Sequence, residues 1–155
     1  QLRLVGRGSR RSIVAWSFAG IQSDLNLDGL ATQAAPSGKI VQPTQDKNPN
    51  GVVAIDHVAI QTSDWQKTEA ALATVGLIPK KRNMGKVRKG LVQLFYKTET
   101  TIIEIMAPLE VPAESHGARF WGLTFVSSDL DSTHRYLAAS TKAPWKAVQP
   151  GRRIT

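Results

Sequence analysis

The stretch VVAIDHVAIQTSDWQKTEAALATVGL, residues 52–77, predicts a strand that leads directly into a short helix. Its first ten residues are mostly apolar and rich in β-branched types, which is typical of a buried strand. Ser63 and Gln66 have the spacing of a capping box, and the charge of Asp64 stabilises the same helix start. Gly76 ends the helix, because glycine readily adopts the left-handed conformation that follows a last turn. This strand and helix open one β-α unit.

The same pattern returns further along the chain, in FWGLTFVSSDLDSTHRYLAAS, residues 120–140. An apolar strand again leads into a helix that begins with Ser and Asp. An internal repeat of this kind predicts two related β-α-β units that pack together, because neither can bury its sheet face alone. The identical positions, when the two copies are aligned without gaps, include Ser63 with Ser128, Asp64 with Asp129, Thr68 with Thr133, Leu72 with Leu137 and Pro79 with Pro144.

The repeat divides the chain into three parts. Residues 1–50 precede it, residues 51–110 hold the first copy, and residues 111–155 hold the start of the second copy. After its helix, the first copy continues with two more strands, near residues 86–97 and 100–106, joined by a tight turn. The second copy stops before the corresponding strands. The N-terminal strands are therefore expected to cover the sheet edge that it leaves open.

The first 50 residues predict two short strands and a long connector. LRLVG, residues 2–6, alternates in polarity, and SIVAWSFAG, residues 12–20, is rich in β-forming residues. The segment GRGSRR between them supplies turn-forming residues. Residues 23–50 are dominated by Asn, Asp, Gly, Pro, Ser, Gln and Thr, which predicts a connector with little regular structure.

The chain carries a net charge of +8, and much of it lies in the basic run KKRNMGKVRKG, residues 80–90. Such an excess favours anionic partners at long range. The run has no aromatic residue for stacking on bases and no DNA-reading motif around it, so nucleic acid is not the expected partner. The run is either a solvated hairpin or loop, or a patch that attracts an acidic small molecule.

The absence of cysteine excludes disulfides, thiolate nucleophiles and cysteine-type zinc sites, and it fits the reducing cytoplasm. No apolar run approaches the roughly 20 residues that a membrane-spanning helix needs. The chain begins at Gln1 without an initiator Met or an apolar signal segment, as expected for the interior of a longer chain. We therefore expect a cytoplasmic protein with no membrane partner.

Two polar residues, His57 and Glu104, stand in otherwise apolar strands. Alternate side chains of a strand share a face, so His57 points with Gln61, and Glu104 points with Met106. A carboxylate in such a strand is costly to bury unless it is paired or bound to a metal. Imidazole and carboxylate are ligands of divalent Zn, Mn, Ni and Fe. The alternatives are that the two groups hydrogen-bond each other, or that the imidazole is satisfied locally.

Two stretches of the first copy, IDHVAIQTSDWQKTEAALATVGL and VQLFYKTETTIIEIMAP, resemble the first βαβββ module of the vicinal oxygen chelate superfamily. This superfamily includes glyoxalase I, bleomycin-resistance proteins and extradiol dioxygenases. FWGLTFVSSDLDSTHRYL resembles the opening of its second module, and ARFWGLTFVSSDLDST and AVQPGRRIT are similar to an actinobacterial branch of glyoxalase-like proteins. The resemblance covers about residues 52–155. It implies an α+β fold, in which paired modules with curved mixed sheets form a ligand-binding cup and the second module is incomplete.

The resemblance also implies a metal site made from corresponding strands of the two modules. His57 matches the His of the first strand, and Glu104 matches the Glu of the fourth strand, which could alternatively act as a catalytic proton shuttle. The third position falls on Gly122, which has no ligating side chain, and the fourth lies beyond the end of the chain. Trp121 and Phe125 are expected in the core in preference to the cup. The expected ligand-contacting residues are Gln61, Tyr96 and Trp121.

Three functions agree with these residues. The first is a metal-dependent lyase, isomerase or dioxygenase, in which His57 and Glu104 hold a divalent ion that acts as a Lewis acid on adjacent oxygens of the substrate. The second is a metal-free module that binds an apolar or anionic small molecule, or sequesters a drug, with residues 80–90 near the mouth of the cup. The third is a scaffold in which His57 and Glu104 bond only each other. Pairing of modules between two copies would make a homodimer.

Overall fold

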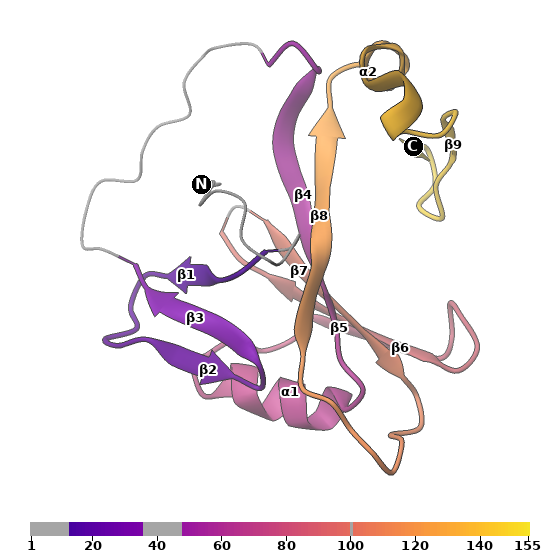
Figure 1. The fold of residues 1–155 in the computed structure, drawn as a ribbon. Helices are drawn as coiled ribbons and strands as arrows, with labels where there is room; N and C mark the ends of the chain where they lie inside the picture. Colours follow the sequence, from indigo (N-terminus) through magenta and orange to yellow (C-terminus); the bar gives the residue numbers. More distant parts are fainter. Residues whose placement is uncertain (1–12, 36–47, 100) are drawn as a thin grey trace. The chain divides into compact units, whose positions relative to one another are not determined.

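The structure is a computed structural model that describes residues 13–35, 48–99 and 101–155 (Figure 1). The predicted strand at residues 2–6 lies outside the described residues. Contacts divide the described residues into two compact units: unit 1, with residues 13–35, 57–99 and 101–123, and unit 2, with residues 48–56 and 124–155.

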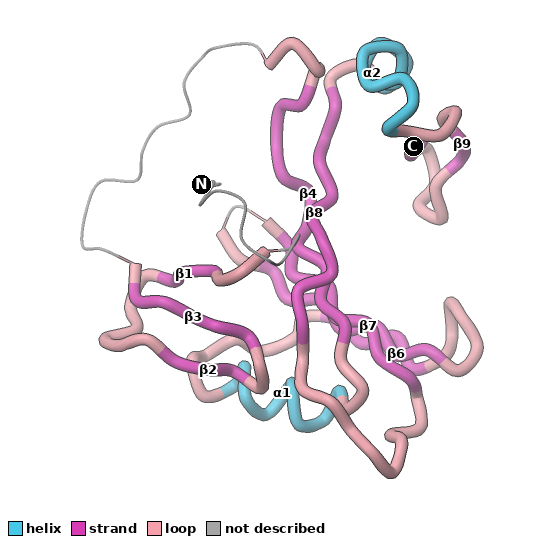
Figure 2. Tube along the Cα trace, viewed as in Figure 1, coloured by secondary structure: helices cyan, strands magenta, loops and turns pink. Residues whose placement is uncertain are grey.

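The largest sheet has five strands, of which β4 and β8 run on from unit 1 into unit 2. Its elements, with the helix between them, are β4 (Val52–Gln61), α1 (Trp65–Ala73), β5 (Lys81–Met84), β6 (Leu91–Lys97), β7 (Ile102–Pro108) and β8 (Arg119–Ser127). The strands lie in the order β5-β6-β7-β4-β8 (Figure 2). β6 pairs antiparallel with both β5 and β7, whereas β4 pairs parallel with β7. The segment from β4 to β7 thus has the predicted βαβββ order, and the α+β fold with a mixed sheet is confirmed.

Helix α1 begins where the sequence predicts, but with a different cap. The carboxylate of Asp64 accepts a hydrogen bond of 3.0 Å from the backbone N–H of Lys67. The predicted capping box of Ser63 and Gln66 is wrong, because the carboxylate one position later makes the backbone bond and adds a charge that the helix dipole favours. The Ser63 hydroxyl instead donates to the backbone carbonyl of His116.

The core of unit 1 lies between α1 and one face of the five-stranded sheet. Burial alternates along β6 and β7, so that Val92 and Leu94 are fully buried, as are Ile103 and Ile105. Leu72 of α1 belongs to the same cluster. The intervening side chains of both strands point to the opposite face, which we call the open face. The open face carries the polar side chains of the candidate site.

A separate three-stranded sheet precedes the βαβββ segment, with β1 (Trp16–Phe18), β2 (Leu25–Leu27) and β3 (Leu30–Ala34) in the order β1-β3-β2. The predicted strand at residues 12–20 contains β1. β2 contacts α1, and apolar side chains of this sheet join the core of unit 1. The prediction that the N-terminal strands at residues 2–20 cover an open sheet edge is wrong for β1. This strand pairs with β3 in a separate sheet, and its aromatic side chains pack against the core of unit 1.

Strands β2 and β3 form a hairpin that the sequence analysis assigns to an irregular connector. The two turn residues, Asp28 and Gly29, both have positive φ, at 53° and 99°. A type I′ turn needs this conformation, and Asp-Gly is one of its preferred dipeptides. Leu27 and Leu30 flank the turn and are buried. The prediction for residues 23–50 is therefore wrong here, because turn chemistry outweighs the polar composition.

Unit 2 contains the second helix and a short strand pair. Its elements besides the ends of β4 and β8 are α2 (Leu130–Leu137), the 3-10 helix η1 (Ala138–Ser140), β9 (Trp145–Lys146) and β10 (Arg153–Ile154). β9 and β10 pair antiparallel, and Arg153 forms a bidentate ion pair with Asp131 at the start of α2. Among the helices of the described residues, none is long and apolar enough to cross a membrane.

The starts of α1 and α2 contain equivalent hydrogen bonds, as the internal repeat predicts. In unit 1 the hydroxyl of Thr68 lies 2.9 Å from that of Thr62. In unit 2 the hydroxyl of Thr133 lies 2.6 Å from that of Ser127. An Asp caps each helix, and its backbone N–H donates to the hydroxyl two residues before it, which is Thr62 for Asp64 and Ser127 for Asp129. The two copies therefore share geometry as well as sequence at these helix starts.

Candidate functional site

Three polar side chains meet on the open face of unit 1, one from each of three neighbouring strands. Glu104 of β7 is central, and its Oε2 lies 3.4 Å from Nε2 of His57 on β4. Its other oxygen, Oε1, accepts a hydrogen bond of 2.8 Å from Nε2 of Gln93 on β6. We call His57, Gln93 and Glu104 the polar cluster.

The register of the strands explains why these residues meet. Glu104 stands opposite Ala59 on β4 and opposite Phe95 on β6. His57 and Gln93 are each two residues from those positions, so their side chains reach Glu104 diagonally across the same face. The structure thus brings together the His and the Glu that the sequence singles out. Their roles as metal ligands or catalytic groups stay predictions.

The polar cluster is partly buried but accessible. The side chains of His57 and Glu104 are 21% and 14% exposed. Partial burial of the carboxylate is tolerated because each of its oxygens has a polar neighbour. The exposed remainder faces away from the core, so a ligand on the open face can contact both the imidazole and the carboxylate.

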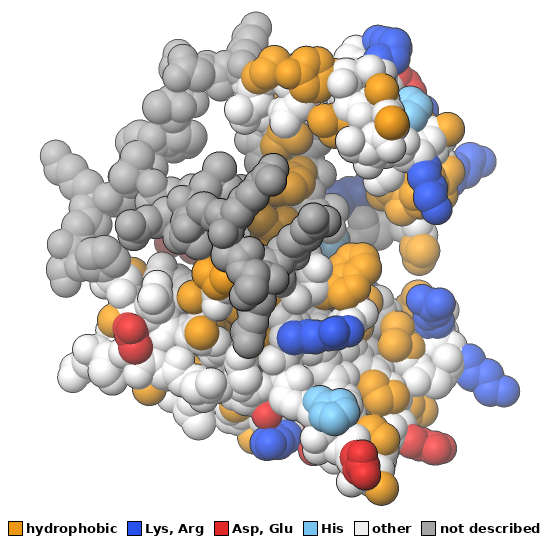
Figure 3. Space-filling view, in the orientation of Figure 1, with side chains coloured by type: hydrophobic (Ala, Val, Ile, Leu, Met, Phe, Trp, Pro, Cys, Tyr) orange, Lys and Arg blue, Asp and Glu red, His pale blue; other side chains and the backbone are white. Residues whose placement is uncertain are grey.

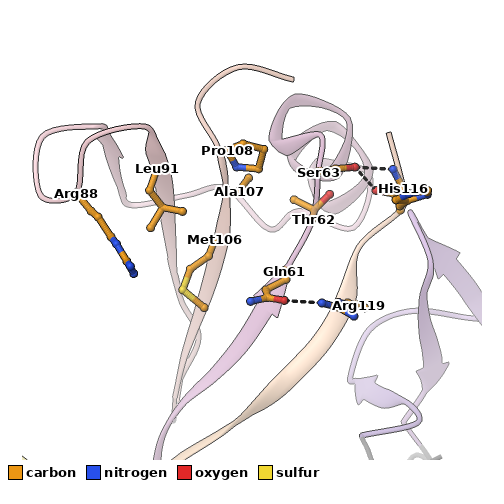
Figure 4. A pocket seen from close by; sticks show the side chains of 11 residues that line it. Gln61, Thr62, Ser63, Arg88, Leu91, Met106, Ala107, Pro108, His116 and Arg119 are labelled. Atoms are coloured by element: carbon orange, nitrogen blue, oxygen red, sulfur yellow. Dashed lines mark hydrogen bonds between the residues drawn. The ribbon is translucent and has the colours of Figure 1, made fainter. Parts of the chain in front are cut away.

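A cavity of about 560 Å³ opens on the same face of unit 1. Arg88, from the β5–β6 hairpin, and Arg119, from β8, lie on opposite sides of it, with Met106 and Gln61 between them (Figure 4). Met106 follows Glu104 by two positions on β7, so the cavity and the polar cluster share one face of the sheet. Together they form the candidate site.

Gln61 is the predicted ligand-contacting residue that lines the cavity. Its Oε1 accepts a hydrogen bond of 2.9 Å from Nη2 of Arg119. Because Gln61 follows His57 by four positions on β4, an even number, the amide points to the face that carries the imidazole. Gln61 therefore links the cavity to the polar cluster. Its contact with a ligand stays a prediction.

Tyr96, the second predicted ligand-contacting residue, lies on the other face of β6. Its side chain is 1% exposed and belongs to the core cluster. Its hydroxyl has no hydrogen-bond partner among the described residues. Burial, followed by the nearby charge of Glu69, raises the pKa of Tyr96 far above its usual value. A ligand on the open face does not reach it.

Trp121 and Phe125, the aromatic residues of β8 that we expect in the core, are exposed. Trp121 is 62% exposed in unit 1, and Phe125 is 44% exposed in unit 2. The prediction of core positions is wrong for both, because an apolar strand sequence does not say whether a second layer covers each face. At Gly122, a Cβ would meet no atom of the described residues within 4 Å, so close packing against them does not require glycine there.

The geometry of His57 and Glu104 fits two positions of a metal site. Ligand bonds of 2.0–2.2 Å in a tetrahedral site place two donor atoms roughly 3.4 Å apart. The observed separation of 3.4 Å between Nε2 and Oε2 agrees with this value. Within residues 13–35, 48–99 and 101–155, no group of three or more His, Asp or Glu side chains is placed to hold an ion. Further ligands would come from water or from a bound molecule.

Three residues of the candidate site are absent from the sequence-based prediction. Gln93 stands as a polar residue in the apolar strand LVQLFYK, which is the same signal that singles out His57 and Glu104. Arg88 belongs to the basic run, but the sequence does not distinguish it from its basic neighbours. Arg119 lies in a connector-like stretch before the second copy, and only the folded chain brings it to the cavity.

Neither the scan of family models nor the comparison with curated proteins gives a match. The comparison with solved structures finds methylmalonyl-CoA epimerase from Mycobacterium tuberculosis, at 19% identity and a TM-score of 0.47, over 63% of this chain and 74% of that one. It also finds a selenomethionine-labelled methylmalonyl-CoA epimerase, at 20% identity and a TM-score of 0.44, over 60% of this chain and 74% of that one.

Proposed function

We propose that unit 1 binds a small molecule on its open face, with the cavity holding the body of the ligand and the polar cluster contacting its polar atoms. The observation that supports this most directly is the shared face: the cavity and the pair of His57 and Glu104 lie on one side of one sheet. A volume of about 560 Å³ is in the usual range of small-molecule sites. The proposal needs no metal.

The polar cluster offers both donors and acceptors to a ligand. The Glu104 carboxylate accepts hydrogen bonds, the Gln93 amide can donate and accept, and the His57 imidazole can do either through its ring nitrogens. A carbonyl or hydroxyl group on the ligand would therefore find a complementary partner. Such a site binds and orients, which is sufficient for a sequestering or carrier function.

A second candidate function is metal-dependent catalysis by a lyase, isomerase or dioxygenase of the vicinal oxygen chelate type. The 3.4 Å separation of His57 Nε2 and Glu104 Oε2 favours it, since these two atoms would hold a divalent Zn, Mn, Ni or Fe ion. Such an ion would supply Lewis-acid stabilisation of negative charge on ligand oxygens. Alternatively, Glu104 would accept a proton from the ligand, with Gln93 holding the carboxylate in place.

Small-molecule binding can be tested with a fragment library and ligand-observed NMR. Met106→Trp fills the cavity, and Met84→Trp introduces the same ring on β5, outside the cavity lining. We expect fragments that bind the native chain to lose their signal with Met106→Trp and to keep it with Met84→Trp. Equal binding by both variants would show that the cavity is not the site.

The metal-dependent candidate can be tested by metal analysis of protein purified without chelator. His57→Ala and Glu104→Ala remove the two donors, and His134→Ala removes an imidazole that hydrogen-bonds Thr141 in unit 2. Stoichiometric metal that is lost in the first two variants and kept in the third would support the enzyme. Failure to load Zn, Mn, Ni or Fe under any condition would exclude it and leave the binding proposal standing.

A further inference from the structure

We infer that the ligand of this site is a small organic anion with an apolar body, and that Arg88 and Arg119 provide the positive charge that binds its anionic group. The inference rests on the proposed function, because it names the chemical class that the open face binds. Two observations support it. Two arginines line the cavity, and neither forms an ion pair among the described residues.

The two cavity arginines differ in their partners from three other described arginines. Arg82, Arg152 and Arg153 each form an ion pair with a carboxylate of their own unit. Arg119 contacts the neutral amide of Gln61, and for Arg88 no ion pair is found among the described residues. Among the described arginines, three guanidinium groups are therefore paired with a carboxylate. Arg135 on α2 donates to the Ser132 hydroxyl instead, and Arg88 and Arg119 are the two of this group that line the cavity.

The described residues that line the cavity include no acidic side chain. Guanidinium groups bind carboxylates and phosphates through paired N–H donors in a fixed geometry. Arg88 and Arg119 lie on opposite sides of the cavity, with Met106 and Gln61 between them, so an anionic group can meet a guanidinium group at either side (Figure 4). The hydrogen bond to Gln61 uses one Nη of Arg119 and leaves its other donors available.

The rest of the lining indicates the body of the ligand. Leu91, Met106 and Pro108 present apolar side chains, and Met adapts well to ligands of different shape. Basic side chains also lie among hydrophobic ones on the molecular surface (Figure 3). Two residues along β7 cover about 7 Å, so a molecule of modest length seated on Met106 reaches Glu104. An organic anion with a short apolar chain matches these features.

The inference can be tested on the full chain by NMR titration with three probes of equal chain length: hexanoate, hexyl phosphate and hexan-1-ol. Arg88→Met and Arg119→Met remove the cavity charges. Lys89→Met on the same hairpin and Arg135→Met on α2 remove equal charge outside the lining. We expect the anionic probes to bind roughly tenfold or more weakly to the two cavity variants, because a charged hydrogen bond is lost. Binding to the control variants should stay within about twofold of the native chain, since only screened long-range charge changes.

The outcomes separate this inference from the proposed function. A stronger response to hexanoate or to hexyl phosphate identifies the carboxylate or the phosphate as the preferred group, and either supports the inference. Equal affinity for hexan-1-ol, or equal loss in cavity and control variants, overturns the anion site while small-molecule binding stands. Absence of binding by all three probes and by the fragment library overturns both. Amide spectra of each variant confirm that the fold is retained.

Discussion

Glu104 and His57 lie on adjacent parallel strands of the five-stranded sheet, with Oε2 of the carboxylate 3.4 Å from Nε2 of the imidazole. The parallel pairing of β4 and β7 produces this contact. It returns the chain, after a helix and two antiparallel strands, beside the strand that opens the βαβββ segment. Gln93 completes the arrangement from the next strand, so the carboxylate is held from both sides. The proposed roles of His57 and Glu104 depend on this relationship.

Removing the charge of Glu104 should weaken the fold modestly. Glu104→Gln keeps the shape of the side chain but replaces the carboxylate that His57 and Gln93 contact. We expect the free energy of unfolding to fall by about 0.5–1.5 kcal/mol, as for the loss of one charged hydrogen bond that is partly offset by the new amide. Urea denaturation measures the change. The exposed Glu110→Gln serves as control, and equal stability of the two variants would contradict the contact.

The hydroxyl of Thr68 should contribute more than that of an exposed threonine. It is fully buried, donates to Oδ2 of Asp28 at 2.7 Å and lies beside the Thr62 hydroxyl. Thr68→Val leaves these groups without their partner at similar volume, so we expect a loss of about 1–3 kcal/mol in the free energy of unfolding. Thr74→Val removes an exposed hydroxyl at the end of α1 and should change it by less than about 0.5 kcal/mol. A small effect of Thr68→Val on the free energy of unfolding would mean that water readily replaces the lost hydroxyl.

Tyr96→Phe should leave the protein as stable as before, or more so. The hydroxyl is buried without a hydrogen-bond partner among the described residues, so its removal relieves a desolvation cost. We expect the free energy of unfolding to rise by up to about 1 kcal/mol. A loss of more than this amount in urea denaturation would show that the hydroxyl has a partner in solution.

The same tyrosine should make stability depend on alkaline pH. Burial raises the pKa of Tyr96 in the folded chain above the value of about 10 that it has when unfolded. Above pH 10 the unfolded chain releases this proton and the folded chain keeps it, so stability falls as pH rises. Tyr96→Phe should flatten this fall between about pH 9 and 11.5. Tyr136→Phe changes the other tyrosine, which is exposed, and should leave the fall in stability unchanged. Identical slopes in both variants would contradict the assignment.

The sequence predicts local features well where a side chain and its neighbours in the chain decide the structure. The strand with His57, the start of α1 and its repetition at α2 are examples, since apolar runs and Asp caps act over a few residues. The Asp28–Gly29 hairpin shows that the same kind of signal is missed when polar composition alone is considered. His57 and Glu104 are recognisable because a polar residue in an apolar strand requires a partner.

Features that depend on distant segments could not be predicted. Arg88 and Arg119 meet at one cavity only because a hairpin turn and the start of β8 come to opposite sides of it. Exposure of Trp121 depends on whether anything covers β8, which strand periodicity does not reveal. The homodimer and the cytoplasmic location stay predictions. Light scattering on the purified chain would measure whether it forms the homodimer.

The central claim, that the open face of unit 1 binds a small molecule, is tested most directly through the two methionines of the chain. Met106 lines the cavity, and Met84 lies on β5, 36% exposed and outside that lining. With both methyl groups labelled with carbon-13, titration with hexanoate, hexyl phosphate and the fragment set reports on each position separately. We predict that bound probes shift the Met106 signal in a saturable way and leave the Met84 signal in place. Probes that bind without shifting the Met106 signal, or a Met106 signal that no probe shifts, would contradict the account.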